Sequence, residues 1–249
     1  NPHRGGGHLR SDKVRMITQD DQTHQSVQIH AGEGGVLLKS LNGSLILETL
    51  TDGEPGQRML IDSEGNVDLE ACENVIEYGS KIEAAVALSI IAMHDVLSLT
   101  AVSEKSYDRN GHHFEETRHL RTEHSAGESI SVQAGGRIYE QATRNMAKLI
   151  MRMAKNGIIQ DIAKNTAKET WMTKGGSWYN SVKTLHTKHS EEVLTCEEFA
   201  EKVVNMTEEG DINRISAKTE AKLLSLILGL YIQLMIIIIL YLSERVEEC

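Results

Sequence analysis

Apolar residues recur at an eight-residue step through the middle of the chain, and this step restricts the fold more than any other feature. Counting by eight from Ile82, most positions as far as Leu194 carry Ile, Phe, Met, Ala, Trp or Leu. A strand returns to the same face after eight residues, because its side chains alternate with a period of two. An α-helix turns by about 800° over eight residues and ends on a different face. The step therefore predicts stacked strands, as in a solenoid or an intertwined fibre.

The stretch "SISVQAGGRIYEQATRNMAKLIMR" at 129–152 tests this interpretation most directly. It divides into three eight-residue units, which place Ile130, Ile138 and Met146 in equivalent positions. A helix over 137–168 is the alternative, since Ala, Met, Lys, Leu, Gln and Glu favour helices. The periodicity favours strands.

Short alternating runs precede this region. They are "SVQIHA" at 26–31, "GSLILETL" at 43–50 and "GNVDLEA" at 65–71, and Gly- and Asn-rich turn segments separate them. Alternation broken by such residues is typical of consecutive β-strands.

Composition restricts the function more than the fold. The net charge is −10, which argues against a general nucleic-acid binder because phosphate contacts need clustered Lys and Arg. Aromatic residues make up only 4%, which suits a thin repetitive architecture. Cys72, Cys196 and Cys249 form no C-x-x-C pair, so a zinc ribbon is not expected.

Two segments carry a family resemblance. "ITQDDQTHQSVQIHAGEGGVLLKS" at 17–40 and "RMLIDSEGNVDLEA" at 58–71, followed by octads such as "SISVQAGG", resemble the central spike of contractile phage tails and the VgrG-type spike of type VI secretion. In that family an OB-fold leads into a trimeric, intertwined β-helix of octads. Asp20, Asp21 and residues 27–31 match the exit from the OB-fold. Most octads here lack the family glycine, with exceptions such as Gly135 and Gly136.

The resemblance implies an all-β fold in three parts. Residues 1–62 would form the OB-fold exit with short strands, 63–200 the elongated octad-repeat β-helix, and 201–249 a hydrophobic tip or a membrane-spanning segment. Three chains would wind around one axis, with the apolar column of each facing the other two. This trimer core would comprise Val67, Leu69, Ile82, Ile90, Phe114, Ile130, Ile138, Met146, Ile162, Trp178 and Leu194.

The implied function is mechanical. The chain would be a non-enzymatic, membrane-piercing spike in a virion tail baseplate or a contractile secretion apparatus, made in the bacterial cytoplasm. Its partners would be two further copies, the baseplate hub, the tail-tube proteins, a tip-capping protein and the target cell envelope. A membrane-anchored protein with a β-rich soluble domain and a fibrous receptor-binding adhesin are the rival interpretations.

The run "LLSLILGLYIQLMIIIILYL" at 223–242 contains twenty residues without a charge, the length of a membrane-spanning helix. As an extended strand it would present one face of only Leu and Ile, suited to the interior of a rod tip. Both interpretations stay open, with a buried strand favoured.

Chemical motifs are scarce. The sequence contains no G-x-S-x-G elbow, no P-loop and no H-E-x-x-H helix motif, so we expect no catalytic residues and no cofactor. Metal binding is not expected either. The single candidate is His186, which falls in the inward octad column and would meet its two copies on a threefold axis.

Overall fold

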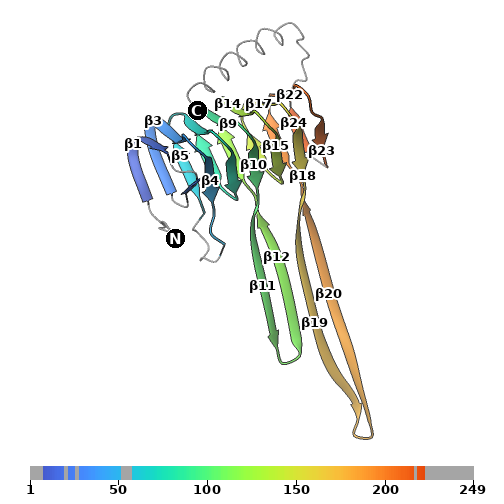
Figure 1. Ribbon diagram of the computed structural model, residues 1–249. Coiled ribbons are helices and arrows are strands. Elements are labelled where there is room, and N and C mark those ends of the chain that lie inside the picture. Colours follow the sequence, from blue (N-terminus) through green and yellow to red (C-terminus); the bar gives the residue numbers. More distant parts are fainter. Residues whose placement is uncertain (1–7, 20–21, 26–27, 52–57, 216–217, 222–249) are drawn as a thin grey trace.

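The computed structural model describes residues 8–19, 22–25, 28–51, 58–215 and 218–221, and all regular structure in these residues is β-strand (Figure 1). Strands stack side by side into a parallel coil, from which two long hairpins project (Figure 1). The all-β prediction is confirmed, and the helical alternative for 137–168 is wrong, because strands occupy that segment.

The coil has three columns of strands, and the chain visits them in turn. The first column contains the start of β1 (His8–Thr18), the start of β3 (Gln28–Ser40), β5 (Leu60–Ser63), β8 (Lys81–Ala84), β13 (Glu123–Ala126), β16 (Arg144–Met146), β21 (Glu197–Ala200) and β24 (Lys218–Ala221). The second contains the ends of β1 and β3, then β6 (Val67–Ala71), β9 (Ala87–Ala92), β14 (Ser129–Ala134), β17 (Leu149–Ala154) and β22 (Lys202–Thr207). The third contains β2 (Gln22–Gln25), β4 (Ser44–Glu48), β7 (Val75–Tyr78), β10 (Val96–Leu99), β15 (Ile138–Gln141), β18 (Ile158–Asp161) and β23 (Ile212–Arg214).

A turn of the coil without a long insertion takes about 21 residues: Ile61 pairs with Ile82 and His124 with Asn145 at 21 residues, and Ile130 pairs with Ile150 at 20. The observed repeat is therefore three strands of unequal length rather than a uniform octad. Strands begin at Leu60, Val67 and Val75, so single steps of seven and eight residues produce the apparent eight-residue period.

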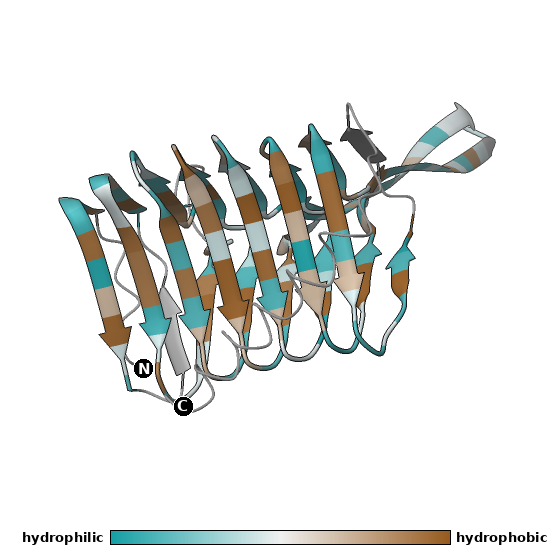
Figure 2. Ribbon diagram, turned by 90° about the horizontal axis from the view of Figure 1, so that it is seen from above, coloured by the Kyte–Doolittle hydropathy of each residue, from teal (hydrophilic) through white to brown (hydrophobic). Residues whose placement is uncertain are grey.

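Strict alternation of side chains creates the interior. In β14 every second residue is buried, and β6 shows the same pattern, so one face of each strand points into the coil (Figure 2). One continuous apolar cluster runs through the coil from Val14 to Ile158. Each parallel strand hydrogen-bonds to the strands of the preceding and following turns of the coil, and from here on each such turn is also called a coil. Unpaired strand edges are therefore left only at the two ends of the stack.

Corners between the third and first columns differ along the coil. After β7 and β15 the chain turns on a residue with positive φ: Gly79 at 61° and Ala142 at 49°. After β10 and β18 a hairpin occupies the corner. Ala101 pairs with Leu120 and Ala163 with Leu194, so each hairpin returns the chain to the place where it left.

The two hairpins join into a four-stranded sheet of their own. It has the order β11 (Ala101–Arg109), β12 (His112–Leu120), β19 (Ala163–Ser177), β20 (Asn180–Leu194), with antiparallel pairing throughout. The shorter hairpin turns at Asn110 and Gly111, which have φ of 54° and 75°. Positive φ at both central residues is the geometry for which Asn-Gly is the preferred sequence.

The expected domain boundaries fall within continuous structure. β3 and β5 already pair in parallel with later strands, so the coil includes much of 1–62. The apolar run at 223–242 lies outside the described residues. Across the described parts of the chain, no helix is both long and apolar enough to cross a bilayer.

Gly135 lies where the turns of two successive coils touch. A Cβ built on this residue would collide with the backbone carbonyl oxygen of Met93, in the turn of the coil before it. A clash with backbone cannot be relieved by a side-chain rotation, so a glycine is needed here to keep the coils at their hydrogen-bonding distance.

We expect Gly135→Ala to lower the free energy of unfolding by about 1–3 kcal/mol, as overpacking typically does. Gly175→Ala is the matched control, because nothing lies within 4 Å of its Cβ position on the exposed hairpin. Urea denaturation followed by circular dichroism measures both. Equal stability of the two variants would contradict the close approach of the coils.

Candidate functional site

The structure separates the predicted core residues into two groups. Those inside the coil, each 0% exposed, are Val67, Leu69, Ile82, Ile90, Ile130 and Ile138. Leu194 is also buried, at 9% exposure, but it packs with Ala142 and Ala163 at the base of the longer hairpin. The other four residues are not enclosed by the coil. Ile162, just before β19, and Phe114, on β12, are half-buried. Met146 is exposed, and Trp178 is 96% exposed at a hairpin tip. The eight-residue count placed Phe114 and Trp178 inward because it ran through the hairpin insertions. Their role in a trimer core stays a prediction.

Polar side chains replace apolar ones inside the later coils. The inward position of the first column is Ile29, Ile61 and Ile82, then His124, Asn145 and Glu198. In the second column Leu69, Ile90 and Val132 lead to Arg152. In the third column Leu47 leads to Glu77, Ser98, Glu140 and Gln160. These polar residues, together with Arg214, form the candidate functional site, which we call the ionic core. Its members are Glu77, Ser98, His124, Glu140, Asn145, Arg152, Gln160, Glu198 and Arg214.

Glu77 and His124 form the first part of the ionic core. His124 Nε2 lies 2.9 Å from Glu77 Oε2, and both side chains are buried. The hydroxyls of Ser80 and Ser98 donate hydrogen bonds to the same carboxylate at 2.7 and 3.1 Å. Three side chains, from the turn before β8, from β10 and from β13, thus converge on one buried carboxylate of β7.

The surroundings of His124 require its charged form. Its Nδ1 lies 2.7 Å from Asn145 Oδ1 and its Nε2 faces the Glu77 carboxylate, so both ring nitrogens must donate. Burial by itself lowers the pKa of His124, but the Glu77 charge and these hydrogen bonds outweigh it, and the pKa lies above its usual value of 6.5. Burial likewise opposes ionisation of Glu77, yet His124 and the two serines hold the pKa of Glu77 below 4.5.

Arg152 is the centre of the second part of the ionic core and is fully buried. Its Nε donates to Glu140 Oε1 at 2.8 Å, and its Nη1 lies 2.6 Å from Glu198 Oε1. Gln160 Nε2 also donates to both carboxylates, and Arg214 Nη2 lies 2.6 Å from Glu198 Oε2. One guanidinium and one amide therefore bridge carboxylates from two different columns.

Electrostatic attraction keeps Arg152 charged despite its burial. Desolvation lowers the pKa of Arg152, but Glu140 and Glu198 more than compensate, so the pKa is raised. Within the described residues, Arg152 Nη2 has no hydrogen-bond acceptor. A buried donor without an acceptor costs free energy, so the network is not arranged for maximal stability alone.

The ionic core is balanced in charge. Three carboxylates face three cations when His124 is protonated: Glu77, Glu140 and Glu198 against His124, Arg152 and Arg214. Buried ion pairs add little net stability compared with apolar packing, but separating one is costly. The arrangement therefore supports the specific alignment of successive turns of the coil. Ile stacks equally well on any Ile, whereas each charge here must meet particular partners of opposite charge.

Cys196 borders the ionic core but is not a nucleophile. Its Sγ donates to the carbonyl oxygens of Glu140 and Asp161 at 3.5 and 3.4 Å. Burial, followed by the nearby Glu140, raises the pKa of Cys196 to about 12. The thiolate that nucleophilic chemistry requires is therefore not formed at neutral pH.

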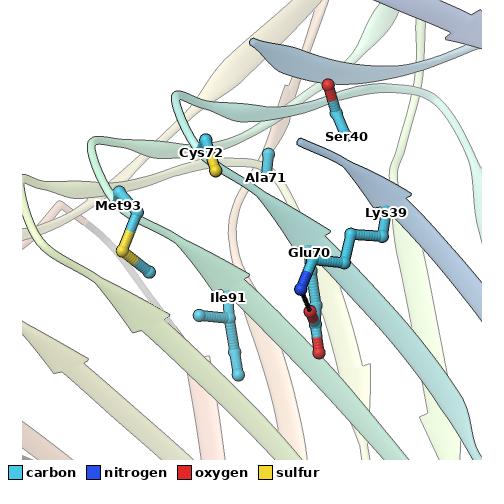
Figure 3. A pocket seen from close by; sticks show the side chains of 7 residues that line it. All are labelled: Lys39, Ser40, Glu70, Ala71, Cys72, Ile91 and Met93. Carbon is cyan, nitrogen blue, oxygen red and sulfur yellow. Dashed lines mark ion pairs between the residues drawn. The ribbon is translucent and has the colours of Figure 1, made fainter. Parts of the chain in front are cut away.

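A shallow depression on the coil is lined by residues of β3, β6 and β9 and the turns that follow them (Figure 3). Lys39 Nζ lies 3.3 Å from Glu70 Oε2 across it, while Ile91 and Met93 line its apolar part. Because the two charges neutralise each other, the depression offers little net charge to a ligand. It is separate from the ionic core.

His186 lies on exposed β20 and not inside the coil. Its Nε2 is 2.8 Å from Thr173 Oγ1, and its ring stacks on Trp171 at 5.1 Å. Within the described residues, no three His, Cys, Asp or Glu side chains converge as metal ligands do. Its axial position in a trimer stays a prediction.

No protein-family model, no curated protein and no solved structure matches the chain. Any function proposed for the chain therefore rests on the geometry of the coil and on the sequence resemblance.

Sequence reasoning missed the ionic core. In the sequence Glu197 and Glu198 are adjacent carboxylates of the kind that usually lie on a solvated face, whereas Glu198 is 1% exposed. A signal was present: Glu77, Glu140 and Arg152 occupy alternating positions between apolar residues, as in "VIEY" and "IYEQ". Recognising this signal requires knowing that successive turns of the coil pair about 21 residues apart, and the two hairpins conceal this spacing in the sequence.

We expect Arg152→Met to lower the free energy of unfolding by about 3–5 kcal/mol, because it leaves the buried Glu140 without a cation and Glu198 with Arg214 alone. Arg118→Met is the control, since Arg118 pairs with Glu116 on the exposed hairpin sheet and its loss should leave the free energy of unfolding nearly unchanged. Denaturant unfolding compares them. A stable Arg152→Met variant would show that the carboxylates do not depend on this cation.

The Glu77–His124 pair predicts a defined pH dependence. Because the pKa of His124 is raised on folding, its contribution is complete below pH 6.5 and is lost as pH rises through the folded-state value. Because the pKa of Glu77 is lowered, its contribution is complete above pH 4.5 and is lost as pH falls. The pair should stabilise the coil most between these two values.

His124→Gln should therefore flatten the decline in unfolding free energy above pH 6.5, a decline of at most about 1.4 kcal/mol per pH unit for one group. Urea titrations between pH 5 and 9 measure it. His189→Gln, on an exposed strand, should retain the wild-type slope. If His124→Gln also retained that slope, His124 would not be the titrating group.

Proposed function

We propose that the chain is the structural, membrane-piercing central spike of a contractile injection machine, acting as a rigid trimeric rod. The observation that carries the proposal is the stacked coil with a filled interior. Seven strands of one column lie in register, which gives a stack on the order of 30 Å deep at about 4.8 Å per strand. Backbone hydrogen bonds run along this direction, so axial load is shared by every strand.

The interior supports a mechanical role. Apolar packing fills the early coils and the ionic core fills the later ones, with Arg152 and Glu198 both buried. An element that must keep its shape under load benefits from contacts that fit one register only. The segments at 17–40 and 58–71 that resemble the spike family add to this support.

The proposed trimer can use the same inward residues in either of two connectivities. A coil of three columns encloses Leu69, Ile82 and Ile138 whether one chain supplies all three strands or three chains supply one each. The partners would then be two further copies, the baseplate hub and tube proteins, and the target envelope.

Light scattering of the detergent-free chain tests the trimer. A mass of about three times 27.7 kDa is expected, and a monomer would contradict the proposal. The cysteine pair Ile76→Cys/Leu97→Cys then tests the connectivity, because these residues are parallel neighbours on β7 and β10. Intertwined chains would give disulfide-linked oligomers on a non-reducing gel, and separate coils would give only cross-linked monomer. Each single substitution controls for the native cysteines.

A further inference from the structure

The longer hairpin ends in two exposed aromatic residues. Its fifteen-residue strands β19 and β20 place the tip on the order of 50 Å from the coil, at about 3.3 Å per residue (Figure 1). Ser177 pairs with Asn180, so the connecting turn consists of Trp178 and Tyr179 alone. Trp178 is 96% exposed and Tyr179 is 76% exposed, and their rings meet edge to face.

These aromatics are unfavourable for the turn they occupy. Two-residue hairpin turns prefer residues such as Asn-Gly that accept positive φ. The shorter hairpin of the same sheet uses Asn110 and Gly111 with positive φ, whereas neither Trp178 nor Tyr179 has positive φ. Here the neighbouring Gly176 takes a φ of 103° instead. The longer hairpin thus gives up the preferred turn and places two large rings in solvent, which folding alone does not explain.

Two lysines behind the tip show the same departure from folding preference. Lys174 and Lys183 lie directly opposite each other on β19 and β20, and both are exposed. Like charges in opposed positions destabilise a strand pair. Between Thr170 and Ser190 the chain has three lysines and no Asp or Glu, although its net charge is −10. The positive charge is therefore concentrated at the end of the arm.

Exposed apolar side chains complete the surface. Met172 and Leu185 are opposed neighbours with 60% and 63% exposure, two residues behind the lysine pair and on the same face. Tryptophan and tyrosine concentrate at the boundary between lipid headgroups and acyl chains. Lysines near such a boundary are attracted by anionic headgroups while their stems cover apolar surface.

We propose that the tip of the longer hairpin, residues 170–190, docks on the surface of an anionic phospholipid membrane. Trp178 and Tyr179 enter the headgroup layer, and Lys174 and Lys183 bind anionic headgroups. A polysaccharide would use the rings but not the opposed lysines, and a nucleic acid would need basic residues along a groove. The inference does not depend on the proposed spike function, since it concerns only the arm.

Fluorescence of the full chain with lipid vesicles tests the docking. The chain has two tryptophans, so Trp171→Phe leaves Trp178 as the only reporter at the tip. With vesicles of phosphatidylcholine and phosphatidylglycerol, Trp178 emission should shift to shorter wavelength and be quenched by brominated lipid. Trp178→Phe, which reports from Trp171 on the strand, should be quenched less. This local readout excludes signals from binding by the apolar run at 223–242.

Two variants test the two parts of the surface. Trp178→Asn/Tyr179→Gly installs the turn of the shorter hairpin, so the arm should fold, while tip-dependent vesicle binding should be lost. Lys174→Gln/Lys183→Gln should weaken binding to anionic vesicles by about fivefold for each lysine, about 25-fold together. Tyr107→Thr, an exposed aromatic of the shorter hairpin, should bind as wild type does.

Several outcomes would overturn the proposal. Trp178 emission that vesicles do not change would show that the tip stays in water. Equal affinity for anionic and neutral vesicles would remove the role of the lysines. A chain that forms trimers but leaves Trp178 unquenched would contradict the docking alone, whereas a monomer with quenched Trp178 would contradict the spike alone.

Discussion

In-register stacking of one coil on the next is the constraint on which the rest of the structure depends. Most strands hydrogen-bond to a strand 20–22 residues away along the chain, or further where an insertion intervenes, and all three columns must keep their registers together. A shift of one residue in any column would turn its inward face outward. Turns must also pass close to each other, which explains why Gly135 lies against the backbone of Met93.

The change from apolar to ionic interior follows from this constraint. Identical aliphatic ladders hold coils together but do not distinguish one coil from another. The later coils flank two insertions, where the chain must find its place again after a long excursion. The ionic core supplies unique partners there: Glu77 and His124 lie on opposite sides of the first hairpin in sequence, and Arg152 and Glu198 on opposite sides of the second.

The sequence predicted the fold class but not the repeat. Alternation in "SISVQAGG" identified strands correctly, because burial on one face is a local pattern. The coil length was hidden for two physical reasons. Unequal strands approximate an eight-residue step, and the hairpins at 101–120 and 163–194 have their own alternation, which continues the apparent period. The ionic core could not be predicted, since Glu140, Arg152 and Glu198 are brought together only by the correct register.

The hairpins show why a coil of this type accepts long insertions. An antiparallel hairpin begins and ends at paired residues, such as Ala163 and Leu194, so it replaces a corner without changing the path of the coil. At the two corners after β7 and β15, Gly79 and Ala142 adopt positive φ, a strained conformation for alanine. An insertion removes the need for that conformation. The free-energy cost of an insertion is therefore mainly the conformational entropy lost when its own residues become ordered. The length and the tip sequence of each arm are then free to be determined by what the arm contacts.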